Sequence, residues 1–355
     1  MSRSDRVAGR LAEGELDLLL VTDLTNLRYL TGFTGSNAMA VVGRDVRRFV
    51  TDFRYVEQAA SQVRDFDREQ GPQDFVGALR DGWPEGELRL GFEDARVTVR
   101  QHARIREAVP DRVELVPAGE LIEAERAVKE PGEVALIRAA AVLADEVYDW
   151  LRGWGVVGRT EREVALALEH EMRRRGAQDP SFSSIVASGP RGALPHASPG
   201  LEEIARDTLV TFDMGVRLDG YCSDCTRTWA TGVPPDDLAE AHALVQRAQA
   251  AALAAVRPGP TGREVDAVAR ELIEQAGHGE HFGHGLGHGV GVQVHEAPRL
   301  ARTSTELLAV GNVVTVEPGV YLAGRGGVRI EDLVVVTERG TEVLTSTTKE
   351  LVVVD

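Results

Sequence analysis

The sequence of 355 residues lacks any long hydrophobic run. No stretch of about eighteen consecutive apolar residues occurs, so we expect no transmembrane helix. The N-terminal stretch MSRSDRVAGRLAEGELD mixes charged side chains throughout and has no apolar centre of the kind that a signal peptide requires. We therefore expect a cytoplasmic protein.

Basic side chains are also in short supply. Lys and Arg number 40 against 56 Asp and Glu, which gives a formal net charge of −16. A surface this negative repels the phosphate backbone of nucleic acids. Together with the missing hydrophobic run, this excess of acid leads us to expect neither a nucleic acid nor a membrane as a partner.

Cysteine occurs only twice, as Cys222 and Cys225 in YCSDCTRTW. A Cys-x-x-Cys pair can signal redox chemistry or zinc binding. A structural zinc site needs about two further ligands nearby, and no other cysteine exists. The alternating pattern predicts a strand, on which residues three apart face opposite ways. We interpret both cysteines as small, half-buried strand residues.

The composition that remains is that of a globular protein with enough residues for two domains, 43% hydrophobic and 27% charged. Residues 1–124 alternate strand-like segments such as DLLLVTD with helix-like segments such as VRQHARIREAV, which predicts an α/β domain. Pro131 then opens a long helical pattern, with Glu133 in its first turn. We place the domain boundary between residues 124 and 125.

The second domain, residues 125–355, contains an internal repeat. GRTEREVALALEHEMRRRG (residues 158–176) resembles GPTGREVDAVARELIEQAG (residues 259–277) with a constant offset of 101 residues. Each copy starts with a Thr-x-x-Glu capping box and stops at glycine, so each predicts one helix. A strand, a glycine-containing turn and a second strand follow each copy. We expect two related halves around a pseudo-two-fold axis.

Each half carries two acidic residues placed about a hairpin turn. Asp213 and Asp224 flank the first turn almost symmetrically, and Glu317 and Glu331 each lie seven residues from Gly324 in the second. Residues equidistant from a hairpin turn face each other on paired strands. Because their sequence neighbours are apolar, we expect two pairs of buried carboxylates.

Two buried carboxylates that face each other cannot both ionise without a cation. One acidic residue alone would be interpreted as the solvent-exposed end of a strand. Two symmetric pairs indicate a metal site instead. Two divalent ions would balance four carboxylates, and oxygen ligands with one imidazole suit Mn²⁺, Co²⁺ or Fe²⁺ better than Zn²⁺. Such ions, about 3.5–4 Å apart, would share a water and lower its pKa toward about 7. The resulting hydroxide would be the nucleophile.

Between the acidic pairs lies HFGHGLGHGVGVQVHE, residues 281–296, which holds four of the nine histidines. Its glycines would let the backbone approach metals and substrate without interference from a Cβ atom. Histidines that do not bind metal would donate hydrogen bonds to a substrate carbonyl and to the oxyanion. The four are His281, His284, His288 and His295.

These motifs resemble the peptidase family of methionine aminopeptidase, aminopeptidase P and prolidase. FDMGVRLDGYCSDCTRTW is similar to the segment with the two aspartate ligands, and HGLGHGVGVQVHE to the histidine signature of the proline-specific branch. VEPGVYL and GVRIEDLVVV are similar to the segments with the two glutamates. The resemblance covers about residues 130–350 and, more weakly, the N-terminal domain. It implies an α/β (α+β) protein, with a creatinase-type N-terminal domain (1–124) before a duplicated pita-bread catalytic domain (125–355).

The resemblance also implies a metal-binding role for five residues. Asp213 would bind one metal ion, and His288 and Glu317 would bind the other. Asp224 and Glu331 would bridge the two ions. Glu317 would in addition carry a proton from the bridging water to the leaving nitrogen.

Five further positions match substrate-binding or supporting residues of the family. His284, His295 and His196, the last in SFSSIVASGPRGALPHASP, would bind the substrate and take part in catalysis. Tyr321 and Arg329 would orient Asp213. His281 matches no residue of known role in the family.

The implied activity is cleavage of the bond between an N-terminal residue and a following proline. The compact chain favours an Xaa-Pro dipeptidase (prolidase), with an aminopeptidase P that acts on longer peptides as the alternative. Metal-free creatinase-like enzymes and binding modules share the fold but lose metal ligands, all of which are present here. Methionine aminopeptidase usually lacks the N-terminal domain.

The resemblance further implies the cofactor and the partners. We expect two divalent metal ions per chain, with Mn²⁺ favoured and Co²⁺, Zn²⁺ or Fe²⁺ as alternatives. The substrate would be a proline-containing di- or oligopeptide. The chain would form a homodimer.

Overall fold

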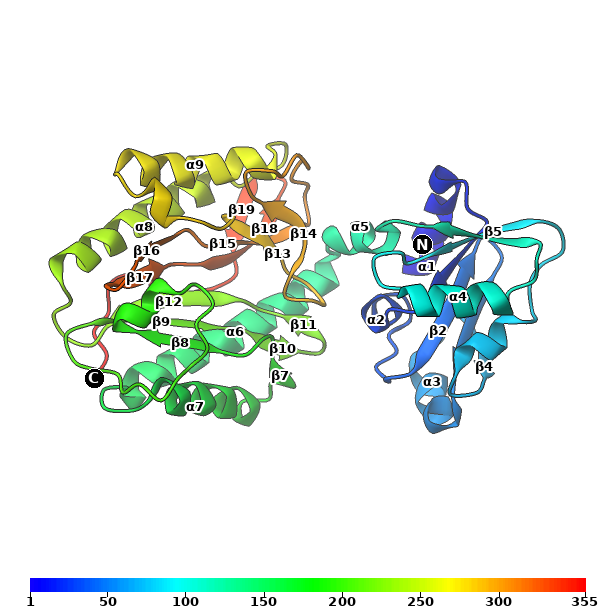
Figure 1. Cartoon of the computed structure of the whole chain (residues 1–355), viewed down its shortest axis with the longest axis horizontal. Helices are drawn as coiled ribbons and strands as arrows, with labels where there is room; N and C mark the ends of the chain where they lie inside the picture. The colour runs from blue at the N-terminus through cyan, green and yellow to red at the C-terminus, as the bar shows by residue number, and fades with distance from the viewer. The chain divides into compact units, whose positions relative to one another are not determined.

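The computed structural model describes residues 1–355 and divides into two compact units, Met1–Arg126 and Ala127–Asp355 (Figure 1). The boundary expected between residues 124 and 125 falls in the helix α5 (Leu121–Ala127), at the end of the first unit. None of the helices is both long and apolar enough to cross a bilayer.

The first unit is built on one mixed six-stranded sheet in the order β4-β3-β2-β1-β5-β6. The segment DLLLVTD forms a strand as expected, and AMAVVG and RRFVTD form two more, because their apolar side chains are buried in the core. Its strands are β1 (Leu18–Val21), β2 (Ala38–Gly43), β3 (Arg47–Thr51), β4 (Asp67–Gln70), β5 (Leu88–Phe92) and β6 (Val113–Pro117), and its other helices are α1 (Arg3–Arg10), α2 (Leu24–Thr31), α3 (Val56–Gln62) and α4 (Val99–Ala108).

The second unit has strands between two pairs of helices, α6 with α7 and α8 with α9 (Figure 1). Its helices are α6 (Pro131–Trp154), α7 (Glu161–Arg174), α8 (Asp236–Ala255) and α9 (Gly262–Gln275). Its strands are β7 (Asp179–Pro180), β8 (Ile185–Ser188), β9 (Leu209–Met214), β10 (Val216–Leu218), β11 (Tyr221–Cys222), β12 (Cys225–Ala230), β13 (Gly287–Gly289), β14 (Glu296–Leu300), β15 (Val313–Val316), β16 (Gly319–Leu322), β17 (Gly326–Arg329), β18 (Asp332–Thr337) and β19 (Gly340–Val343).

The predicted duplication is visible in matching helix starts. Thr160 caps α7 and Thr261 caps α9, and each makes a complete capping box with the glutamate three residues later. Both helices are 14 residues long and remain offset by 101 residues along their whole length. The local sequence therefore sets the start of each helix, because the cap satisfies backbone N–H groups that the first turn leaves unpaired.

The strands of the two halves also correspond. One sheet has the order β12-β9-β8, and the other has the order β14-β13-β15-β18-β19. The hairpin tips leave these sheets as β10 with β11 and as β16 with β17. The first tip turns at Asp219 and Gly220, both with positive φ, as a two-residue hairpin turn requires.

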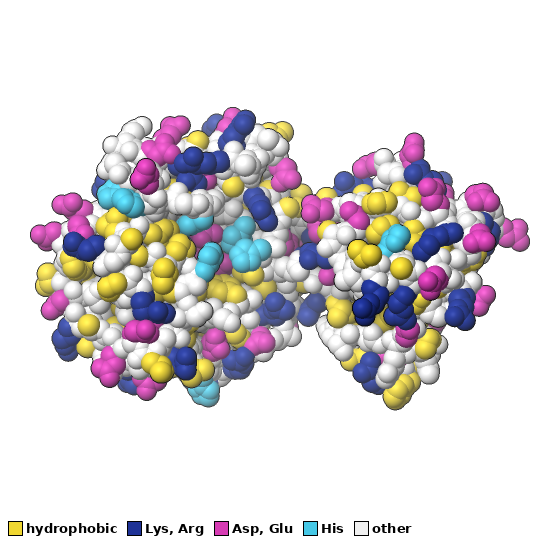
Figure 2. All heavy atoms as spheres, viewed as in Figure 1, with side chains coloured by type: hydrophobic (Ala, Val, Ile, Leu, Met, Phe, Trp, Pro, Cys, Tyr) yellow, Lys and Arg dark blue, Asp and Glu magenta, His cyan; other side chains and the backbone are white.

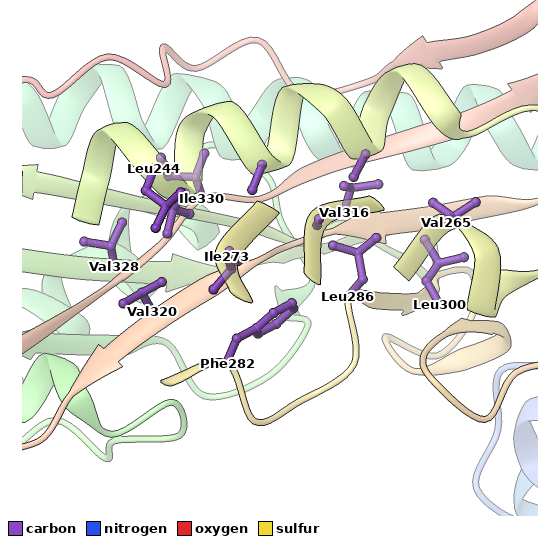
Figure 3. Packing of buried hydrophobic residues seen from close by; sticks show 14 of the residues in the cluster. Leu244, Val265, Ile273, Phe282, Leu286, Leu300, Val316, Val320, Val328 and Ile330 are labelled. Carbon is purple, nitrogen blue, oxygen red and sulfur yellow. The ribbon is translucent and has the colours of Figure 1, made fainter. Parts of the chain in front are cut away.

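A buried apolar cluster joins α8 and α9 to the second sheet (Figure 3). Val265 and Ile273 of α9 pack with Val316 of β15, and Phe282 and Leu286 of the glycine-rich stretch belong to the same cluster. Full burial of such a side chain stabilises the fold by roughly 1.5–3 kcal/mol. The histidine-bearing stretch is thus attached to the core through its apolar residues.

One expectation about burial is wrong. Cys222 and Cys225 are completely buried and unpaired, because hairpin residues on both faces here pack against other elements of the unit. His242 of α8 is also buried. His170 of α7 is exposed.

Candidate metal centre

The two glutamates lie side by side at the ends of paired strands. Val316 of β15 pairs with Asp332 of β18, and the same register continued by one residue sets Glu317 opposite Glu331. The spacing from the hairpin turn therefore located this pair correctly. Glu331 is buried, as its apolar sequence neighbours predicted.

The two aspartates are offset instead of directly opposite. Asp213 pairs with Thr226, so Asp224 is a diagonal neighbour two residues along the opposite strand. The hairpin is interrupted after β9, where the backbone N–H of Val216 donates to Ser223 Oγ at 3.0 Å. The symmetric count around the turn missed this interruption, although both aspartates still face the same side.

The acids of both hairpins converge on one histidine. The ligand atoms of Asp224, His288 and Glu331 all lie within 4.8 Å of one another. His288 Nε2 lies 3.6 Å from Asp224 Oδ2 and 3.3 Å from Glu317 Oε1. The two halves of the duplicated unit thus bring their acidic residues to a common centre.

The centre has the chemistry of a cation site. Asp213 Oδ1 and Glu331 Oε1 are buried without a hydrogen-bond donor, an arrangement that costs free energy unless a cation compensates. Burial, and then repulsion by the neighbouring carboxylates, raises the pKa of Asp224 and Glu331 well above the usual range. Burial also raises the pKa of Glu317. An oxygen-rich set with one imidazole fits divalent metal ions.

A guanidinium fixes Asp213 from behind. Arg329 Nη2 donates to Asp213 Oδ2 at 2.7 Å, and Arg329 Nη1 donates to the Tyr321 hydroxyl at 3.1 Å. The Tyr321 hydroxyl also lies 2.8 Å from His284 Nε2. Arg329 thus contacts Asp213 directly, whereas Tyr321 reaches Asp213 only through Arg329 and connects that arginine to His284.

Two threonines that the sequence analysis did not single out orient the glutamates. Thr226 Oγ1 donates to Glu331 Oε2 at 2.7 Å, and Thr315 Oγ1 donates to Glu317 Oε1 at 3.0 Å. Both threonines lie on strands that pair beside the acids. Their only sequence signal is a hydroxyl side chain two residues from an acid, Asp224 in one case and Glu317 in the other.

His284 has both ring nitrogens engaged. Nδ1 lies 2.7 Å from the carbonyl oxygen of Gly285, which can only accept, so Nδ1 carries the hydrogen. Nε2 of the neutral ring then accepts from the Tyr321 hydroxyl. Burial lowers the pKa of His284, which favours this neutral form.

His295 and His196 are more exposed than His284. The His295 ring centre lies 4.3 Å from that of His288, and burial followed by repulsion from His288 lowers the pKa of His295 to about 4. His196 follows Pro195, whose carbonyl accepts from Arg329 Nη1 at 3.1 Å. Figure 2 shows histidine side chains gathered on one face of the second unit, with acidic atoms visible between them.

His281 stands apart from this group. Its Nδ1 lies 3.2 Å from Nδ1 of His278, just after the end of α9. This pairing assigns it no part in the centre.

Neighbouring strands give two of the glycines a further reason. A Cβ atom at Gly287 would overlap the backbone carbonyl of Thr315, and one at Gly289 would overlap that of Ala297. Both carbonyls belong to neighbouring strands. These glycines therefore permit close strand packing around His288.

The chain resembles known proteins over its whole length. A model of metallopeptidase family M24 matches residues 135–338, and a model of the creatinase/prolidase N-terminal domain matches residues 3–128. An uncharacterized peptidase of Bacillus subtilis is 43% identical over 339 residues, which cover 95% of this chain and 96% of the relative.

Solved structures are also similar to the chain over nearly its whole length. An Xaa-Pro dipeptidase from Bacillus anthracis has a TM-score of 0.94 and 38% identity, with 99% of each chain covered. An X-Pro aminopeptidase from Thermotoga maritima has a TM-score of 0.89 and 34% identity, with 100% of each chain covered.

Proposed function

The chain belongs to metallopeptidase family M24 and is a peptidase, and we propose that it cleaves the bond between an N-terminal residue and a following proline with two divalent metal ions. The observation that carries the proposal is the convergence of Asp224, His288 and Glu331, beside buried carboxylate oxygens that no protein donor satisfies. We assign Asp213, Asp224, His288, Glu317 and Glu331 as the ligands.

The number of ions follows from charge. Four carboxylates surround the centre, and Arg329 contacts only Asp213 among them. Two divalent ions with one bound hydroxide would neutralise the three acids that remain, whereas a single ion would leave a negative charge uncompensated. Mn²⁺ suits this set of oxygen ligands with a single imidazole.

The catalytic step divides between the ions and the side chains. When bound, the ions would supply a water of lowered pKa as the nucleophile and polarise the scissile carbonyl. The Glu317 carboxylate accepts the proton of that water and returns it to the proline nitrogen as the bond breaks. Burial raises the pKa of Glu317, which favours its acceptance of a proton.

The histidines bind the substrate. An Xaa-Pro bond has no N–H group, so recognition must use its carbonyl and the groups on either side. We assign His295 and His196 to this role because both are exposed beside the centre. His284 would donate through Nε2 only after the Tyr321 hydroxyl gives way to the substrate and the ring gains a proton.

The two remaining specificities, dipeptidase and aminopeptidase, differ in the length of the substrate. We propose a dipeptidase, because the Xaa-Pro dipeptidase from Bacillus anthracis is more similar in both structure and sequence than the X-Pro aminopeptidase from Thermotoga maritima. The aminopeptidase activity on longer peptides is the alternative. A cytoplasmic homodimer remains part of the proposal.

A comparison of Xaa-Pro with Xaa-Pro-Yaa hydrolysis tests the proposal, with Mn²⁺ supplied and a chelated sample as the control. We expect rapid release of proline from the dipeptide, slow cleavage of the tripeptide, and no activity after chelation. Faster cleavage of the tripeptide would favour the aminopeptidase. Full activity in the chelated sample would rule out the metal mechanism.

A further inference from the structure

The stretch that carries His284 and His288 has little rigidity of its own. Gly283, Gly285, Gly287 and Gly289 alternate with His284, Leu286 and His288, and among these residues only 287–289 form a strand. Glycine retains more backbone freedom than any other residue, so this sequence does not fix the position of an imidazole. Contacts from outside the stretch must do so.

A buried ion pair on α9 lies against this stretch. Arg270 Nε donates to Asp266 Oδ2 and Arg270 Nη2 donates to Asp266 Oδ1, each at 2.7 Å. The two residues are one helical turn apart, and their side chains are only 7% and 1% exposed. A forked pair at this depth has a single geometry, because the guanidinium is planar and both oxygens are occupied.

The pair holds three alternate residues of the glycine-rich stretch. Arg270 Nη1 donates to the carbonyl of Phe282 at 2.9 Å, and Arg270 Nη2 donates to the carbonyl of His284 at 2.7 Å. Asp266 Oδ1 accepts the backbone N–H of Leu286 at 3.0 Å. The guanidinium carbon also lies 4.1 Å from the centre of the Phe282 ring.

The apolar residues on either side of His284 complete the attachment. Phe282 and Leu286 both belong to the cluster that includes Val265 and Ile273 of α9 (Figure 3). The Phe282 ring lies edge-on to the His284 ring, with 5.1 Å between their centres. The backbone of His284 is therefore fixed from α9, while its ring is directed to Tyr321.

We propose that Asp266 and Arg270 are positioning residues that hold His284 where it meets the substrate. This inference rests on the proposed role of His284 and extends it to two residues that touch neither metal nor substrate. Lysine cannot replace Arg270 in this role, because one ammonium group cannot reach two carboxylate oxygens and two carbonyls in one plane.

The central variant is Arg270→Lys, which keeps the charge and loses the fork. The matched control is Arg174→Lys on α7, where the arginine pairs with the buried Glu171 and touches no histidine. We expect Arg270→Lys to keep its metal content and to lower kcat/KM for Xaa-Pro by roughly 10- to 100-fold, the cost of a misplacement of about 1 Å. Arg174→Lys should match the unaltered protein.

Two readouts separate positioning from a general structural role. Hydrogen exchange of the metal-loaded protein should become faster in the peptide spanning residues 282–288 and stay unchanged in β15. The kinetic loss should fall in the same parameter, kcat or KM, as the loss caused by His284→Ala. If Arg270→Lys does not fold, Asp266→Asn keeps the shape of the pair and serves in its place.

A double-variant cycle tests whether Arg270 acts through His284. In the His284→Ala background, Arg270→Lys should have no further effect beyond about threefold. An equal loss in both backgrounds, or a loss of metal from Arg270→Lys, overturns the inference. A normal rate for His284→Ala would refute the proposed role of His284. A slow His284→Ala beside a normal Arg270→Lys would refute the positioning role alone.

Discussion

At the scale of single residues, the centre is a set of acids that repel each other until a cation is present. Asp224→Asn should remove a ligand with little change of shape. We expect loss of at least one ion per chain and of turnover, measured by elemental analysis and peptide hydrolysis. The increase in melting temperature on adding Mn²⁺ should also shrink, because that increase reflects binding to the folded state. Two ions per chain at a normal rate would contradict the assignment.

Substitution of the different histidines should have different effects on metal binding and on turnover. His288→Ala should weaken metal binding, because an imidazole is lost from direct contact with the ion. His295→Ala and His196→Ala should keep their metal and lose turnover by roughly 10²- to 10³-fold, the usual cost of one lost donor to the reacting carbonyl. Metal content and kinetics of the three variants provide the test. Metal loss from His295→Ala, with none from His288→Ala, would reverse the two roles.

Sequence patterns located the acids and histidines better than they located the groups around them. Glu317 and Glu331 follow from their equal distance to a glycine turn, because antiparallel pairing is regular there. Asp213 and Asp224 do not obey the same count, because the first hairpin changes sheet between them. The donors Thr226 and Thr315 act across strands, and no local spacing reveals such partners.

At the scale of the elements, the buried histidine of α8 makes stability depend on pH. Burial lowers the pKa of His242 from its usual 6.5, and its Nε2 has no hydrogen-bond partner. Below that pH the unfolded chain binds a proton that the folded chain does not, so stability is lost as pH falls from about 6.5.

Denaturant unfolding of the chelated protein between pH 8 and pH 5 measures this effect. The free energy of unfolding should fall more steeply for the unaltered protein than for His242→Gln. Chelation removes the contribution of metal release at low pH. Parallel curves for the two proteins would show that His242 does not titrate on unfolding.

The glycine-rich stretch before and within β13 should tolerate glycine replacement only where neighbouring atoms leave space. A Cβ atom at Gly287 would overlap the Thr315 carbonyl, whereas one at Gly283 would meet no atom within 4 Å. Gly287→Ala should therefore lower the free energy of unfolding by about 1–3 kcal/mol. Gly283→Ala should change it little. Denaturant unfolding of both variants checks this. Equal effects would mean that strand packing does not explain these glycines.

Helix ends were predictable at this scale because their signals are local. The capping boxes at Thr160 and Thr261 fix the starts of α7 and α9 wherever those helices pack. The glycine-rich stretch is the opposite case. Its conformation depends on Asp266 and Arg270, which are distant in sequence and look like an ordinary exposed helical pair at one-turn spacing.

At the scale of the whole molecule, the proposed metal centre lies in one unit. Every residue of the metal centre belongs to Ala127–Asp355. The first unit has a polar network of its own, in which buried Glu93 accepts from Asn26 and from the backbone N–H groups of Thr22 and Asp23. That network is internal, and it fixes the ends of β1 and β5 by hydrogen bonds.

The first unit holds none of the proposed catalytic residues. It can still influence the reaction if it lies beside the metal centre of a partner subunit. We expect a homodimer in which the first unit of one subunit limits the space beyond the proline at the centre of its partner. Sedimentation at micromolar concentration should give twice the monomer mass, and only monomer would contradict the expectation. Dilution below the dissociation constant should then raise the rate on Xaa-Pro-Yaa relative to Xaa-Pro, because the block leaves with the partner. A dimer whose ratio of rates stays constant on dissociation would place the limit on substrate length within the single chain.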